Sequence, residues 1–148
     1  GISMESHCSW ATLNPNHWVS VQSLWNADRT LDELLQDYCT GFFNIPGDPN
    51  SQPLAQAMFG YFSTLEKALA NHAPMIHWGQ RDIPDFFTKE VADQCRAYIQ
   101  KASDIANAST QPGADIVRKR MHMTMLGFRY LEKVKVGALA LLPQRGTE

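Results

Sequence analysis

Apolar residues recur at helical spacing along most of the chain, and three long segments show the clearest pattern. In each, the apolar positions are separated alternately by four and three residues, as in a helix with one narrow apolar seam. The seams are Leu54, Met58, Tyr61, Leu65 and Ala68; Val91, Cys95, Tyr98, Ala102 and Ile105; and Val117, Met121, Thr124, Phe128 and Leu131. Ala92, Ile99 and Ala106 widen the second seam. The pattern predicts three helices of about 20 residues that share one core.

Two shorter helices are predicted before the three long ones. Asn14 is a capping residue and Pro15 suits a first turn, so the first helix is expected from Asn16 to about residue 25. One face of it carries Trp18, Val21, Leu24 and Trp25. The second helix is predicted to open with a capping box, in which the side chains of Thr30 and Glu33 each accept a hydrogen bond from the other residue's backbone amide. It is expected to end near residue 43.

The two links between the long helices differ in character. Residues 107–113 form a short link, so the last two helices are expected to be antiparallel neighbours. Residues 71–88 are too apolar for a free loop. They include Met75, Ile76, His77, Trp78, Phe86 and Phe87. We expect this link to pack over the bundle or against a missing neighbour, and to end at Thr88 as the N-cap of the next helix.

The first five residues show a different pattern, in which Ile2 and Met4 alternate with small or polar residues. Such alternation predicts a short strand, which needs a sheet partner. Since no other segment is a convincing strand, the partner is expected upstream of Gly1; a disordered start is the alternative. The predicted fold is mainly α: a helical bundle of three long antiparallel helices and two shorter N-terminal helices, preceded by a short strand.

Composition narrows the classes of protein. The chain has 148 residues, of which 44% are hydrophobic and 19% charged, so it has enough apolar surface to fold. No apolar stretch reaches the roughly 18–20 residues that cross a bilayer, so no membrane contact is predicted. The formal net charge of -2 argues against a nucleic-acid-binding protein that relies on bulk positive charge. The three cysteines match neither a disulfide framework nor a zinc motif.

The remaining polar motifs are weak. No two of the five histidines have the spacing that places two metal ligands on one helical face, so neither a metal nor another cofactor is predicted. Met121 and Met125 share a face with Phe128, which favours core methionines over a soft-metal site. The basic triplet 118–120 lies opposite the seam, and we expect it to form a solvated face rather than a phosphate site.

One segment, residues 5–10, has the composition of a functional site. Glu5 ends the predicted strand, and His7 and Trp10 follow in a loop. In a (β/α)8 barrel the carboxyl ends of the strands face the active site, and paired carboxylates there act on glycosides. A tryptophan in the loop could stack on a sugar ring. An ordinary strand-to-helix connection with a solvated glutamate explains the same residues equally well.

The residues up to about 43 resemble the end of a bacterial glycoside-hydrolase-like barrel. The resemblance rests on residues 1–5, the aromatic loop through Trp10, residues 14–19 and residues 24–38. The family is catalogued as domain of unknown function 4838 and is similar in plan to the alpha-glucuronidases of glycoside hydrolase family 67. Ala27 departs from the family pattern, which has proline after the Asp or Asn.

The resemblance implies that the chain is the C-terminal piece of a larger carbohydrate-active protein. Residues 1–28 would be the last strand, loop and helix of a (β/α)8 barrel, and residues 29–148 a helical domain that buttresses it. Glu5 would be a catalytic carboxylate at the rim, with His7 and Trp10 binding the substrate. The missing barrel would contact an oligo- or polysaccharide, in the periplasm or outside a bacterium. The fragment alone would be inactive, because its second carboxylate would lie on missing strands.

Two other functions compete with this hypothesis. The first is a self-standing helical module that binds another protein and has no catalytic activity. The second is a metal-binding bundle, which added zinc or copper would stabilise. The histidine spacing disfavours the metal-binding bundle.

Overall fold

A computed structural model describes residues 10–71 and 83–141, and the side chains of residues 14–71 and 83–136. These residues form helices and no strand, which confirms the mainly α prediction. The helices are α1 (Trp10–Trp25), α2 (Leu31–Phe42), α3 (Ser51–Ala70), α4 (Ile83–Phe86), α5 (Lys89–Ala108) and α6 (Ala114–Leu141). None of the helices in these ranges is long and apolar enough to cross a membrane. The strand predicted at the start of the chain lies outside the described residues.

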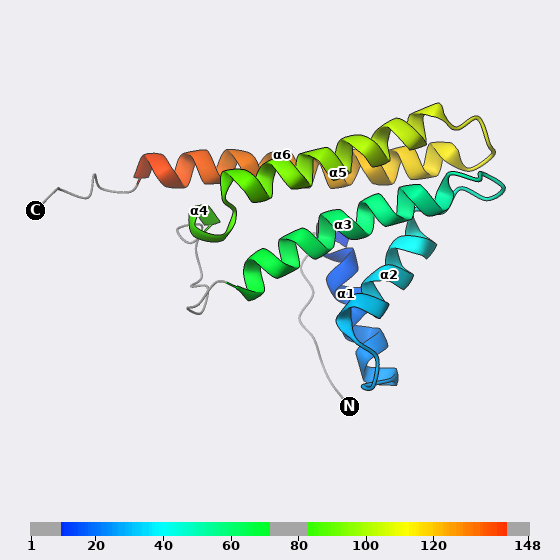
Figure 1. The fold of residues 1–148 in the computed structure, drawn as a ribbon, viewed down its shortest axis with the longest axis horizontal. Coiled ribbons are helices and arrows are strands. Elements are labelled where there is room, and N and C mark those ends of the chain that lie inside the picture. The colour runs from blue at the N-terminus through cyan, green and yellow to red at the C-terminus, as the bar shows by residue number, and fades with distance from the viewer. Residues whose placement is uncertain (1–9, 72–82, 142–148) are drawn as a thin grey trace, which may run out of the picture.

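The three long helices lie lengthwise against one another, and α1 and α2 form a hairpin that projects from them at an angle (Figure 1). α5 runs antiparallel to both α3 and α6, as the short link before Ala114 predicts. α2 packs against α3, and α1 packs against α2 and α6. The bundle predicted from the seams is therefore confirmed.

The core follows the predicted seams of α3 and α6 but not the whole seam of α5. Leu54, Met58, Met121 and Phe128 are buried. On α5 the buried positions are Ala92, Cys95, Ile99, Ala102 and Ala106, whereas Tyr98 is 38% exposed. The predicted burial of Tyr98 is therefore wrong. The buried face of α5 is rotated toward Ile99, and the ring of Tyr98 lies against Gly60 on α3.

The contact between Gly60 and Tyr98 gives a stability prediction. A Cβ atom added to Gly60 would lie 2.5 Å from Cε1 of Tyr98, whereas one added to Gly41 on α2 meets nothing within 4 Å. We expect Gly41→Ala to raise the free energy of unfolding by about 0.5–1 kcal/mol through helix propensity, and Gly60→Ala to lower it by roughly 1 kcal/mol through overpacking. Urea unfolding measures both. Gly60→Ala should become stabilising in a Tyr98→Ala background; equal effects of the two alanines in the wild-type background would contradict the proposed clash.

The helix starts agree with the capping signals in two cases out of three. The Thr30 hydroxyl accepts from the Glu33 amide, and the Glu33 carboxylate accepts from the Thr30 amide, so the capping box is confirmed. Thr88 caps α5 as predicted. The predicted start of α1 is wrong, because the helix begins at Trp10 and contains Pro15. A proline inside a helix lacks the amide donor, and its ring crowds the carbonyl oxygen four residues earlier. The helix α1 nevertheless continues on both sides of Pro15.

Part of the apolar link packs into the bundle. Phe87, directly after α4, is fully buried, and Ile83 and Phe86 pack partly buried against the core. The Phe87 ring meets the edge of Phe128, with 6.1 Å between ring centroids, and the Lys135 ammonium lies 5.5 Å from its centroid. The prediction that this link covers the bundle is confirmed for these residues, whereas its members from 75 to 78 lie outside the described residues.

The basic triplet 118–120 is not a wholly solvated face. Arg118 donates to the carbonyl oxygens of Ala106 and Ser109 at 3.0 and 3.1 Å. Arg120 donates to the carbonyl oxygen of Phe42, and its guanidinium lies 4.3 Å from the centroid of that ring. The last carbonyls of a helix lack intrahelical donors, and these two arginines supply donors to the ends of α5 and α2. The prediction holds only for the exposed Lys119.

Candidate functional site

One exposed apolar surface of the described residues lies on α1. We call it the α1 face; it consists of Trp18, Val21, Leu24 and Trp25. The four side chains are 39%, 45%, 55% and 85% exposed, respectively. Trp18 contacts the ring of Tyr38 at the boundary with α2, and exposure then increases toward Trp25 at the end of α1. The sequence predicted that these residues share a face, and the structure turns that face outward.

A cavity of about 750 Å³ lies between α1, α2 and α3. The residues of α1 that line it are Pro15, Asn16, Val19 and Ser20. Two of these four are polar, whereas all four members of the α1 face are apolar. Between Pro15 and Trp25, the side of α1 with more apolar residues is therefore the more exposed one.

This exposure has a cost in stability that a partner could remove. Burying a valine, leucine or larger apolar side chain stabilises a protein by roughly 1.5–3 kcal/mol relative to exposure. Tryptophan carries a larger contact area than the aliphatic side chains. Isolated exposed apolar residues are normal, but a contiguous group on one helical face is typical of a surface that contacts another protein. The α1 face has the composition of such a docking surface.

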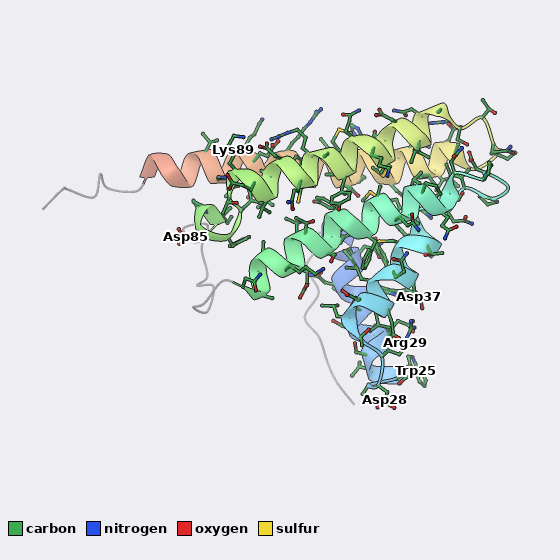
Figure 2. The ribbon with its side chains drawn as sticks, viewed as in Figure 1. Trp25, Asp28, Arg29, Asp37, Asp85 and Lys89 are labelled. Atoms are coloured by element: carbon green, nitrogen blue, oxygen red, sulfur yellow. The ribbon has the colours of Figure 1, made fainter. Side chains whose placement is uncertain are left out.

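The turn that follows Trp25 is held by local hydrogen bonds. The side-chain oxygen of Asn26 accepts from the amide of Asp28 at 3.0 Å. Arg29 pairs with Asp37 of α2, with Nη2 2.6 Å from Oδ2. Figure 2 shows Asp28 and Arg29 near Trp25 at the outer end of the hairpin, and Asp37 further along α2. These contacts join the end of α1 to α2, so Trp25 is presented on an ordered turn.

The start of α2, which follows the same turn, favours ionised carboxylates. Hydrogen bonds from the amide and hydroxyl of Thr30 hold the pKa of Glu33 below its usual range. Asp32 and Glu33 lie in the first turn of α2, where negative charge opposes the partial positive charge of the helix terminus.

The sequence-predicted site residues are not gathered into a described site. Glu5 and His7 lie outside the described residues. Trp10 is the first residue of α1, so its predicted place in a loop is wrong, and only its backbone is described. Its loop placement followed from expecting the helix to start after Asn14, and the earlier helix start removes that basis.

The described cysteines are not activated as nucleophiles, and the described acidic residues do not form a cluster of metal ligands. Cys39 and Cys95 are free and buried, and burial raises the pKa of each thiol to about 12. A thiol with such a pKa is protonated at neutral pH and is a poor nucleophile or metal ligand. Within residues 10–71 and 83–141, no group of three or more His, Cys, Asp or Glu side chains is placed to hold a metal ion.

Comparison of the chain with protein-family models, with curated proteins and with solved structures finds no match. Sequence reasoning identified the members of the α1 face but not its direction. The signal that could have indicated direction is the polar pair Asn16 and Ser20, which lies on the side of α1 opposite the tryptophans.

Proposed function

We propose that this chain is a helical docking domain whose α1 face is covered by a second folded surface. One observation carries the proposal: beyond Trp18, which contacts Tyr38, the apolar side chains of Val21, Leu24 and Trp25 are increasingly exposed along α1. In this role the long helices provide a stable base, and the hairpin of α1 and α2 presents the contact residues.

The glycoside-hydrolase resemblance supplies one partner for this face. In that plan α1 is the last helix of a (β/α)8 barrel, and such helices pack their apolar sides on the barrel strands. Glu5, His7 and Trp10 would then lie near the sugar-binding rim, and any activity would belong to the whole carbohydrate-active protein. If the α1 face normally packs on the barrel strands, it is exposed when the barrel is absent.

A separate partner protein is the second candidate, and the same observation supports it. In that case the chain is an interaction module without catalysis, and the α1 face binds a different polypeptide. The two candidates share the docking surface and differ only in whether the covering surface belongs to the same polypeptide.

Removal of the exposed apolar residues tests the docking surface. The purified chain is expected to self-associate and to bind an apolar fluorescent dye. Leu24→Ser combined with Trp25→Ser should make it monomeric and lower dye fluorescence by about threefold, because this pair dominates the exposed part of the α1 face. Sedimentation velocity and dye titration measure these effects.

The control removes an exposed apolar residue of α3 that belongs to neither proposed surface, Leu69→Ser. This variant should keep most of the self-association and dye binding of the wild-type chain. A wild-type chain that is monomeric at high concentration and binds no dye would contradict the proposal.

A further inference from the structure

A second surface, on α6, combines basic and apolar residues in two neighbouring rows. The first row repeats at alternating spacings of three and four residues, so its members share one side of the helix. It consists of Lys119, His122, Leu126, Arg129, Lys133 and Val136, all of them exposed. The second row is Ile116, Met123 and Tyr130, which are seven residues apart and also exposed. We call these the basic row and the apolar row.

The charge of this surface is positive. Lys119, Arg129 and Lys133 point outward from α6. The two acidic residues of α6 are each paired with an arginine: Asp115 with Arg118, and Glu132 with Arg96 of α5. The basic row therefore favours a ligand that carries carboxylates, and the complementary charge fixes its orientation.

A hollow lies beside the apolar row. Its volume is about 250 Å³, and Tyr130 and Gly127 of α6 line it together with Pro15 of α1. Tyr61 and Phe62 of α3 also line it. Because Gly127 has no side chain, α6 leaves the hollow more open at this position. An apolar side chain from a ligand that lies along α6 can enter this hollow, as anchor residues do in protein interfaces.

We propose that these two rows are the docking site for an acidic amphipathic helix of a partner protein. The carboxylates of that helix would face the basic row, and its apolar residues would contact Met123, Tyr130 and the hollow, in the mode of a helix bound along a groove. The site is distinct from the α1 face, and the proposal goes beyond the docking function proposed there.

The order of the rows favours a protein over a membrane surface. Within the apolar row, Tyr130 lies on the side of α6 toward α1, because Tyr130 and Pro15 line the same hollow. An interfacial membrane helix needs its apolar face outermost, with basic residues at the flanks. Here Lys119, Arg129 and Lys133 share their row with His122 and only two apolar residues, Leu126 and Val136, so the charged side would meet the bilayer first.

A pair of synthetic peptides tests the site on the complete chain. One is a fluorescein-labelled amphipathic helix with leucines on one face and glutamates beside them; the other has lysine in place of each glutamate. Fluorescence anisotropy should show that the acidic peptide binds at least about tenfold more tightly than the basic one. Lys119→Glu with Lys133→Glu should weaken its binding about tenfold, and Met123→Ala should weaken it about fivefold without changing its salt dependence.

The matched control is Lys67→Glu with Lys101→Glu, which reverses two exposed charges on α3 and α5. It should change the affinity by less than about twofold. Absence of binding by the acidic peptide, equal binding of the two peptides, or equal effects of the two double variants would overturn the proposal. Co-sedimentation with phosphatidylserine vesicles without binding of the acidic peptide would overturn it in favour of a membrane.

Discussion

Replacing Phe87 by alanine is expected to lower the free energy of unfolding by about 3–5 kcal/mol, the range for truncation of a buried phenylalanine. Phe87 is fully buried, and its ring contacts Phe128 of α6 and the ammonium of Lys135. Because small domains are stable by only about 5–15 kcal/mol, this loss would leave the chain close to unfolding. Urea unfolding followed by circular dichroism measures it.

The neighbouring residue provides the matched control. Phe86 belongs to α4 and is only partly buried against the core. Phe86→Ala should therefore cost less than half as much as Phe87→Ala. Equal losses, or a loss below about 1 kcal/mol for Phe87→Ala, would show that the segment after α4 does not belong to the core.

The second large effect is a loss of stability at alkaline pH. Burial raises the pKa of Cys39 and of Cys95 from 9.0 to about 12. The pKa of each thiol is higher in the folded state than in the unfolded state. The contribution of the protonated thiols to the free energy of unfolding is therefore complete below about pH 9 and is lost as the pH rises toward 12. Each pKa unit corresponds to about 1.4 kcal/mol, so each thiol contributes a loss of roughly 2–4 kcal/mol at the upper end. Burial also raises the pKa of Tyr38 and of Tyr61, which adds to the loss above pH 10.

Melting temperatures measured from pH 7 to 11 test this prediction. The wild-type chain should lose stability steeply above pH 9, whereas Cys39→Ala with Cys95→Ala should start less stable and lose less over the same range. At pH 8 a thiol reagent should modify Cys39 and Cys95 only after unfolding, with Cys8 replaced by serine to remove its signal. A pH-independent melting temperature or rapid modification of the native chain would contradict the inferred burial.

The sequence predicted those features that depend on neighbours along the chain. The capping box at Thr30, the cap at Thr88 and the three long helices each follow from a local pattern, and the structure confirms them. The predicted start of α1 was wrong because proline, although it is favoured in a first turn and disfavoured inside a helix, occupies an interior position here. The sequence signal at Pro15 does not distinguish these two cases.

Features that depend on contacts between helices were not predictable in the same way. Helical spacing groups Trp18 with Val21 and Trp25 but does not say what covers them. The position of Tyr98 depends on a glycine on another helix, and the roles of Arg118 and Arg120 depend on where α5 and α2 end. These relations arise only after the helices are packed.

The candidate site inferred from the resemblance stays a prediction. Glu5 and His7 lie outside the described residues, and Trp10 is described only as the start of α1. The docking surface is a more general proposal, because it depends on the exposed residues of α1 and not on a particular substrate. A barrel in the same polypeptide and a separate partner both satisfy it.

A photo-crosslinking amino acid at position 25, introduced into the natural polypeptide that carries this sequence, tests the docking function most directly. The same amino acid at position 101, an exposed site on α5, is the control. We predict a specific adduct at position 25 and none at position 101. An adduct within the polypeptide would support an adjoining domain, and an adduct to another protein would support an interaction module. Equal or absent crosslinking at both positions would contradict the proposal that the α1 face is covered.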